Sequence, residues 1–171
     1  MDIYAKLAKD SLEYFVKTGR FLMDQEAVPQ EMKDRRAGVF ITILKDGEER
    51  GYNGTILPVH ANVGDEIIEC AVCAGIYDMR FDRIKEEELD SLTYRVDILS
   101  KPEYVETLEP LDPAVYGIVV SGEAMDRGVA LPGLVEGETV DEQLARAMEA
   151  GGMAPGEQVQ VERFTVERHI G

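Results

Sequence analysis

The sequence predicts an α+β protein with a mixed, mainly antiparallel sheet and about three helices. Helical and strand-like periodicities alternate along its 171 residues, and Asp/Gly turns separate neighbouring strands. Short turns favour antiparallel pairing, because parallel strands need long crossover connections. The expected order is helix, two strands, helix, strand, two strands, helix, strand. A chain of this length suits a single domain over residues 1–171, with room for two lobes.

An amphipathic helix is expected at the start of the chain. Apolar residues recur at helical spacing from Ile3 to Val16, Asp2 is suited to the N-cap, and Gly19 is suited to the stop. The proline-containing, charged stretch at residues 25–36 then predicts a loop.

A hairpin should follow this loop. The run at residues 37–44 is rich in β-branched and aromatic side chains, which is typical of a buried strand. Asp46-Gly47 favours a tight turn. The stretch at residues 49–55 would then lie on or just after the returning strand.

The rest of the chain predicts two more helices and the remaining strands. In order, these are a helix over residues 64–78, a short helical turn over 86–89, strands over 94–99, 116–122 and 128–132, a helix over 139–151 and a closing strand over 158–169. Asn62 or Asp65 should cap the first of these helices, and Thr139 with Glu142 forms a capping box for the second. Imperfect alternation predicts one irregularity in the closing strand.

The charge balance excludes some partners. Thirty-four acidic residues against eighteen basic ones give a net charge of −16. A sequence-independent grip on nucleic acid needs clustered Lys and Arg, and anionic membrane surfaces attract basic segments, so we expect neither partner. No apolar run approaches the roughly 20 residues of a membrane span, and the first residues lack the pattern of a secretory signal. We therefore expect a cytoplasmic protein with reduced cysteines.

The stretch Glu49-Arg50-Gly51-Tyr52-Asn53-Gly54-Thr55 is the strongest candidate site. Glycines at this spacing allow close approach to the backbone, which fits a bulged strand or hairpin turn. They also fit a ligand-facing loop in which Arg50 anchors a small anion and Arg36 assists. The predicted ligand-binding residues are Arg36, Arg50, Gly51, Tyr52, Asn53, Gly54 and Thr55.

The remaining candidate residues give weaker indications of a functional site. Cys70 and Cys73 lie in the middle of a predicted helix with no second cysteine pair, so helix packing is the favoured interpretation over redox or metal use. His60 and His169 have no ligand spacing, and we expect no metal and no cofactor. His60 is either a loop residue without catalytic duty or a general base. No nucleophile elbow, phosphate-binding loop or dinucleotide fingerprint is present.

The order and spacing of several short motifs resemble the AMMECR domain family, in its branch called AmmeMemoRadiSam system protein A. The matching pieces are Arg36-Ala37-Gly38-Val39-Phe40, Arg50-Gly51-x-x-Gly54-Thr55, Asp78-Met79-Arg80-Phe81, Pro102-Glu103, Asp112-Pro113, Tyr116-Gly117-Ile118-Val119-Val120, Arg127-Gly128-Val129-Ala130-Leu131-Pro132, Thr139-Val140-Asp141-Glu142-Gln143-Leu144 and Arg163-Phe164-Thr165-Val166-Glu167-Arg168-His169. The resemblance implies two lobes with a cleft between them, lined by a Leu-Arg-Gly-Cys-Ile-Gly signature. It also implies association with a Memo-type protein and a radical S-adenosylmethionine enzyme.

The sequence departs from that signature at its chemically active position. Tyr52 stands where the family has cysteine, and Glu49 and Asn53 replace leucine and isoleucine. A phenol with a pKa near 10 is a much poorer nucleophile than a thiol. The leading hypothesis is therefore a binding or accessory component of a modification system. One alternative is an enzyme that uses Tyr52 or His60 for proton transfer. The other is a scaffold, in which a structural carboxylate would occupy Arg50.

Overall fold

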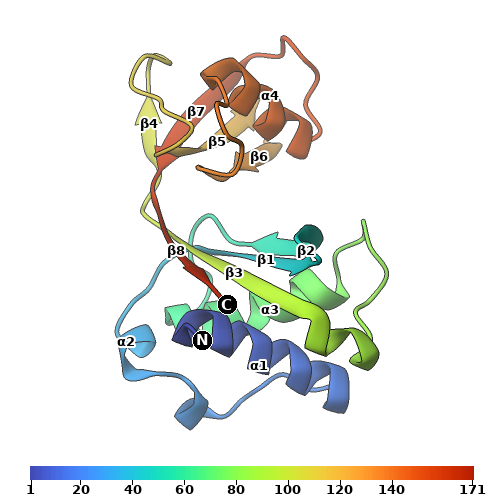
Figure 1. Ribbon diagram of the computed structural model, residues 1–171. Coiled ribbons are helices and arrows are strands. Elements are labelled where there is room, and N and C mark those ends of the chain that lie inside the picture. Colours follow the sequence, from blue (N-terminus) through green and yellow to red (C-terminus); the bar gives the residue numbers. More distant parts are fainter. The chain divides into compact units, whose positions relative to one another are not determined.

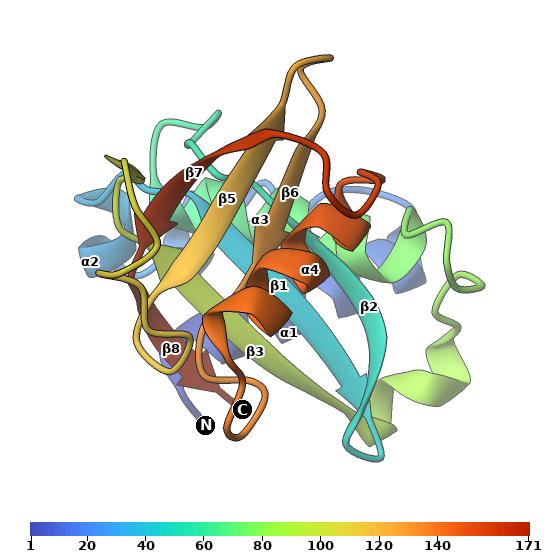
Figure 2. The same ribbon diagram turned by 90° about the horizontal axis from the view of Figure 1, so that it is seen from above.

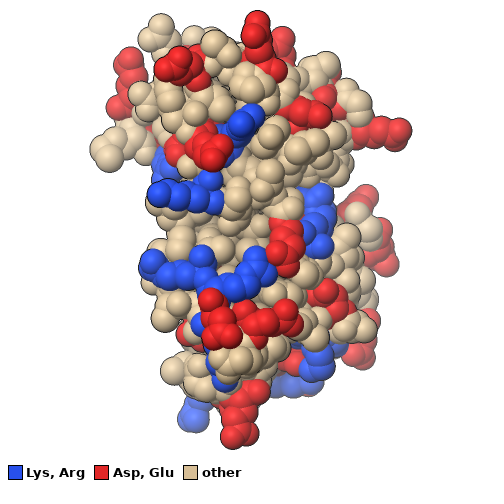
Figure 3. Space-filling view, turned by 90° about the vertical axis from the view of Figure 1, so that its left-hand side faces the viewer, with Lys and Arg blue, Asp and Glu red and all other residues tan.

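The computed structural model describes residues 1–171, which form two compact units. The first unit comprises Met1–Leu99 and Glu167–Gly171, and the second comprises Ser100–Val166. The predicted α+β class is confirmed, and the strand pairings are antiparallel as expected. The strands form two four-stranded sheets instead of the one sheet suggested by the sequence. On the face shown in Figure 3, acidic side chains are scattered and basic ones gather in a few groups.

The sheet of the first unit has the strand order β2-β1-β3-β8 (Figure 2). Its strands are β1 (Val39–Lys45), β2 (Glu48–Gly54), β3 (Leu92–Leu99) and β8 (Val166–Ile170). The helices α1 (Ile3–Thr18) and α3 (Val63–Ile76) cover one face of this sheet (Figure 1). Alternate strand residues, such as Ile41, Ile43 and Tyr94, point into the core that they form with these helices.

Local sequence explains where these two helices begin and end. The Asp2 side chain accepts hydrogen bonds from the backbone N–H groups of Tyr4 and Ala5, and Gly19 ends α1 in the left-handed region at φ 72°. Asn62 caps α3 in the same way. These predicted caps are confirmed. None of the helices is both long enough and apolar enough to cross a membrane.

The predicted loop at residues 25–36 is partly helical. It contains the 3-10 helix η1 (Gln25–Ala27) and the single-turn helix α2 (Gln30–Lys33). The Asp24 side chain caps η1, and Pro29 occupies the N-cap of α2, where its missing N–H has no cost. The predicted helical turn near residue 86 is present as η2 (Glu86–Ser91).

The predicted hairpin turn between β1 and β2 is confirmed. Asp46 and Gly47 both have positive φ, at 54° and 81°. This combination is the one that a two-residue hairpin turn of type I′ requires, and the Asp-Gly pair tolerates it.

The second unit contains a second four-stranded sheet, with the order β4-β7-β5-β6. Its elements are β4 (Glu103–Val105), β5 (Gly117–Gly122), β6 (Arg127–Ala130), α4 (Val140–Ala150) and β7 (Val159–Phe164). Helix α4 packs against β5 and β6 and starts at the predicted capping box of Thr139 and Glu142. Strand β4 was missed, because it has only three residues and follows Pro102.

The predicted closing strand is in fact two strands in different sheets. Its irregularity lies at Thr165, between β7 and β8. The Thr165 backbone N–H donates to Ser100 Oγ at 2.9 Å, and its carbonyl accepts from the Ser100 N–H at 2.9 Å. Ser100 and Thr165 therefore interrupt the ladder at the point where the chain changes sheets.

Candidate functional site

The predicted site stretch lies within β2, at the edge of the first sheet, and it contains a β-bulge. Ile43 pairs with Gly51 while the next residue, Leu44, pairs with Glu49, which leaves Arg50 as the extra residue. The bulge that the sequence allowed is therefore present. Because a bulge re-aims its side chain, Arg50 leaves the alternation of the strand.

The Arg50 guanidinium binds a carboxylate of the same chain. Its Nε and Nη2 donate to the two oxygens of Glu88 on η2, each at 3.1 Å. Lys45 Nζ adds a third contact to Glu88 at 3.1 Å. Burial alone would raise the pKa of Glu88, but hydrogen bonds from Arg50, the Lys85 N–H and Lys45 lower it to about 2. Glu88 thus occupies the Nε–Nη2 edge of Arg50, whereas Nη1 is buried without a hydrogen bond.

Gly51 and Gly54 are required by close packing, and neither has a positive φ. A Cβ at Gly51 would lie 2.2 Å from the carbonyl oxygen of Ala74 on α3. A Cβ at Gly54 would lie 2.3 Å from the ring of Phe40. Gly51 therefore allows α3 to contact β2, and Gly54 leaves room for an aromatic ring.

Tyr52 projects from the face of the sheet opposite α1 and α3. Its ring stacks on that of Phe40 with centroids 5.2 Å apart, and the Arg80 guanidinium lies 5.8 Å from its centre. The Tyr52 backbone N–H donates to Asp78 Oδ2 at 3.0 Å, which satisfies part of the sheet edge. Asn53, its neighbour, is half-buried and pairs with Ile41 in the strand register.

We call the side of this sheet opposite α1 and α3 the distal face. It carries a polar cluster whose full extent the sequence did not reveal. Residues of the distal face include Phe40, Thr42, Tyr52, Arg95, Asp97 and Arg168. Strand alternation places Arg95 and Asp97 on the same face of β3, whereas Arg168 comes from β8, and only the strand order brings it beside them.

Two arginines in this cluster share one carboxylate. Arg168 donates to both oxygens of Asp97, with Nε at 2.6 Å and Nη2 at 3.3 Å. Arg95 donates to Thr42 Oγ1 at 2.9 Å. Arg95 Nε lies 3.5 Å from Asp97 Oδ2, but it is buried and makes no hydrogen bond. Burial lowers the pKa of Arg95, and the positive charge of Arg168 adds to this effect.

The other predicted residues gather around the backbone of His60. Glu66, which is fully buried on α3, accepts from the Thr55 hydroxyl at 2.9 Å and from the His60 N–H at 2.9 Å. Arg36 Nε donates to the His60 carbonyl at 2.9 Å, and its Nη2 donates to the Pro58 carbonyl at 3.3 Å. Arg36 and Thr55 therefore fix a loop. They are not brought together with Arg50.

The predicted residues thus form two groups at opposite ends of α3. Tyr52 contacts Asp78, which lies just beyond the C-terminal end of this helix, whereas His60 contacts Glu66 in its first turn. Fourteen helical residues separate these ends by about 20 Å. Tyr52 and His60 are therefore held at different ends of α3.

The two cysteines fit the predicted packing role. Burial raises the pKa of both thiols, and nearby glutamates contribute in the same direction. Cys70 is buried in the core, and Cys73 is half-buried. No group of three or more His, Cys, Asp or Glu side chains is arranged to hold a metal ion.

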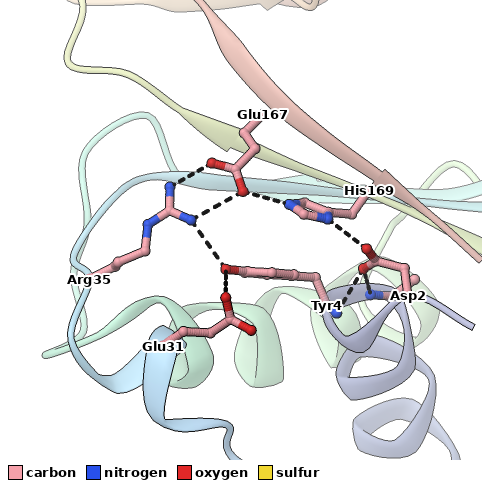
Figure 4. Close-up of polar contacts among 7 residues, drawn as sticks. Asp2, Tyr4, Glu31, Arg35, Glu167 and His169 are labelled. Carbon is pink, nitrogen blue, oxygen red and sulfur yellow. Dashed lines mark hydrogen bonds and ion pairs between the residues drawn. The ribbon is translucent and has the colours of Figure 1, made fainter.

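A second polar cluster, which no sequence pattern indicates, joins the two ends of the first unit (Figure 4). The ring nitrogens of His169 contact Asp2 Oδ2 and Glu167 Oε1, each at 2.8 Å, and the ring stacks on Tyr4. Arg35 binds both oxygens of Glu167, at 3.2 and 2.9 Å. This cluster fastens β8 to the start of α1 and needs no ligand to complete it.

Comparison with known proteins places the chain in a family. The AMMECR1 family model matches residues 5–169, so the chain belongs to the AMMECR1 family, as the motifs indicated. The biochemical function of this family is uncharacterised.

Individual relatives agree with this assignment. A protein of Thermotoga maritima is 41% identical over 168 residues, which cover 97% of this chain and 96% of that protein. A protein of Clostridium acetobutylicum is 40% identical over 169 residues, or 98% of this chain, but this chain spans only 36% of its length. The crystal structure of an uncharacterized protein from Pyrococcus horikoshii matches with a TM-score of 0.87 and 26% identity, covering 96% of this chain and 88% of that one.

Proposed function

We propose that the protein is a recognition component of a modification system and binds an anionic group at the distal face. The observation that carries this proposal is the cluster in which Arg95 and Arg168 share the buried carboxylate of Asp97. Two guanidinium groups and one carboxylate leave a formal charge of +1 in a chain whose net charge is −16. A phosphate or carboxylate of a small ligand or a partner segment would balance this charge.

The state of Arg95 supports the proposal. Its Nε is buried without a hydrogen bond, and burial together with the repulsion from Arg168 outweighs the attraction of Asp97 and lowers the pKa of Arg95. A bound anion would supply the missing acceptor and offset the repulsion. Arginine suits this role because its planar guanidinium binds carboxylate and phosphate with two parallel hydrogen bonds.

The predicted stretch on β2 would contribute the neighbouring surface. Tyr52, Thr42 and Arg95 lie in one row across three adjacent strands, so Tyr52 is about 10 Å from Arg95 across the sheet. The half-buried ring of Tyr52, which stacks on the buried ring of Phe40, would offer an apolar side to a ligand whose charged end meets the arginines. Because Glu88 occupies the Nε–Nη2 edge through which Arg50 could bind an anion with two hydrogen bonds, we assign the anion contact to Arg95 and Arg168.

The proposed partners are a Memo-type protein and a radical S-adenosylmethionine enzyme. The support for this step is the family resemblance, together with the absence of the signature thiol at Tyr52. A protein that lacks its own nucleophile at this position is better suited to present or hold a substrate than to transform it. Co-purification of the tagged chain from its source, followed by mass spectrometry, tests this association. Recovery of neither partner under mild conditions would count against it.

The binding step can be tested by NMR titration of the ¹⁵N-labelled protein with inorganic phosphate, pyrophosphate and citrate. We expect saturable amide shifts in β3 and β8 and affinity that falls as salt rises. Arg95→Gln keeps a polar side chain but removes one charge, and it should weaken binding about tenfold or more, which corresponds to about 1.4 kcal/mol.

Arg127→Gln provides the matched control. Arg127 forms an exposed ion pair with Glu162 at 3.5 Å in the second unit, so its loss removes the same charge elsewhere. Equal affinities for wild type, Arg95→Gln and Arg127→Gln would mean that the Arg95–Asp97–Arg168 cluster only ties β3 to β8, and the proposal would be wrong.

A further inference from the structure

A cavity of about 390 Å³ lies in the first unit beside His60, at the opposite end of α3 from Tyr52. Its walls are formed by Phe21, Leu22, Met23, Gln25, His60, Asp65, Ile68 and Glu69. The volume lies within the range of about 300–1,000 Å³ that is typical of small-molecule sites. Apolar side chains supply half of these residues, and no lysine or arginine is among them.

The polar part of this wall is held in place by the chain itself. His60 Nε2 contacts Glu69 Oε2. The His60 backbone is fixed from both sides, because its N–H donates to Glu66 and its carbonyl accepts from Arg36. Since the ionised Glu69 carboxylate can only accept, the hydrogen of this contact belongs to the imidazole. His60 thereby orients Glu69 in the cavity wall.

Glu69 keeps acceptor capacity for a ligand. Its second oxygen, Oε1, has no hydrogen-bond partner within the chain, and the side chain is 46% exposed. Asp65 adds a second carboxylate, which accepts from Asn62 at 3.0 Å. The wall therefore combines two carboxylates with apolar surface and contains no basic side chain of lysine or arginine.

We propose that this cavity binds a small organic ammonium ion with an apolar body. The charged nitrogen would donate to Glu69 Oε1, and the body would pack on Ile68 and Leu22. The ring of Phe21 adds an aromatic face to which a cation is attracted. A bare metal ion fits less well, because it needs a shell of oxygen or nitrogen ligands and half of this wall is apolar. The site is independent of the distal face.

Three probes with the same aromatic body but different charge test the proposal. These are protonated phenethylamine, neutral 2-phenylethanol and anionic 3-phenylpropionate, titrated into the ¹⁵N-labelled protein at pH 7. We expect the ammonium ion to bind at least tenfold more tightly than the alcohol, the anion to bind more weakly still, and shifts to centre on residues 21–23 and 60–69. Equal affinity for the ammonium ion and the alcohol, or no saturable binding of the ammonium ion, would overturn the proposal.

Variants separate the charge from the apolar wall. Glu69→Gln preserves shape and should weaken ammonium binding about tenfold while leaving the alcohol unchanged. Phe21→Ala should weaken both probes, and the ammonium ion more than the alcohol, because the ammonium ion also loses the aromatic face. Glu87→Gln, an exposed site on η2, removes the same charge outside the cavity and should change neither. Native-like NMR spectra establish that each variant is folded. An unchanged ammonium affinity in folded Glu69→Gln would refute the assignment.

Discussion

Arg50 and Glu88 form a two-point ion pair between the bulge of β2 and the 3-10 helix η2. The two hydrogen bonds are both 3.1 Å long, and the side chains are only 16% and 18% exposed. This pair connects segments that are 38 residues apart in the sequence. Arg50 of the predicted site therefore stabilises the fold. Because the pKa of Glu88 is lowered, this stabilisation depends on pH.

We expect Arg50→Ala to lower the free energy of unfolding by about 1–3 kcal/mol at pH 7, because it leaves a half-buried carboxylate without its main partner. The folded pKa of Glu88 is about 2, against an ordinary value of 4.5. A carboxyl with a depressed folded pKa stabilises the protein above its unfolded pKa and loses this contribution as pH falls toward its folded one. The difference between wild type and variant should therefore shrink below about pH 4.5 in urea unfolding.

Arg83→Ala serves as the control, because Arg83 is exposed and forms no ion pair. Its unfolding free energy should remain within about 0.5 kcal/mol of wild type at every pH. A pH-independent loss in Arg50→Ala would show that the lost packing of the arginine stem, and not the charge on Glu88, explains the effect.

Much of the fold could be predicted because its signals are local. The caps at Asp2, Asn62 and Thr139 and the turn at Asp46-Gly47 each depend on a few adjacent residues. The division into two sheets could not be predicted in this way. The imperfect alternation over residues 158–169 indicates an irregularity, but only tertiary pairing assigns β7 and β8 to different sheets.

The site was predicted only in part, for the same physical reason. The glycine spacing correctly indicated a place of close backbone approach and a bulge. The partner of Arg50 could not be foreseen, because Glu88 lies in an acidic run that resembles a solvated surface. Arg168 joins Arg95 only through the pairing of the last strand with β3. Long-range contacts of this kind leave no periodic signal in the sequence.

Weakening the polar cluster of Asp2, Tyr4, Arg35, Glu167 and His169, which joins β8 to the start of α1, should affect β8 first. Glu167→Gln weakens the contacts with Arg35 and His169, and because Glu167 is 49% exposed the expected cost is about 0.5–1 kcal/mol. The Gly171 N–H donates to the Tyr94 carbonyl at 3.0 Å, so its hydrogen exchange reports the opening of this strand. We expect exchange at Gly171 to accelerate roughly two- to fivefold.

The pH dependence of this cluster has a defined sign. Hydrogen bonds from Arg35 and His169 lower the pKa of Glu167, and burial opposes them. The pKa of Asp2 is also lowered, since hydrogen bonds from His169 and the backbone outweigh its burial. Their stabilisation is therefore complete above the unfolded carboxyl pKa and declines in acid.

Glu162→Gln is the control for Glu167→Gln. It loses only an exposed contact with Arg127, so hydrogen exchange at Gly171 should remain unchanged.

The two thiols should differ in reactivity. Burial raises the pKa of both, so at neutral pH a smaller fraction of each is present as the reactive thiolate. With iodoacetamide at pH 8, we expect Cys73 to react several times more slowly than free cysteine. Cys70 should react only after unfolding in urea, where both rates approach that of the free amino acid. Rapid labelling of Cys70 in the folded protein would contradict the packing role assigned to it.

The contact between β2 and α3 can be tested at a single glycine. Gly51→Ala places a Cβ 2.2 Å from the Ala74 carbonyl oxygen, and two backbone segments cannot yield as a flexible side chain can. We expect the free energy of unfolding to fall by about 2–4 kcal/mol, as in overpacked cores. Gly47→Ala meets no atom within 4 Å and should cost only about 1 kcal/mol, because of its φ of 81°. Equal losses for the two variants in chemical unfolding would mean that α3 can move away from β2 at little cost.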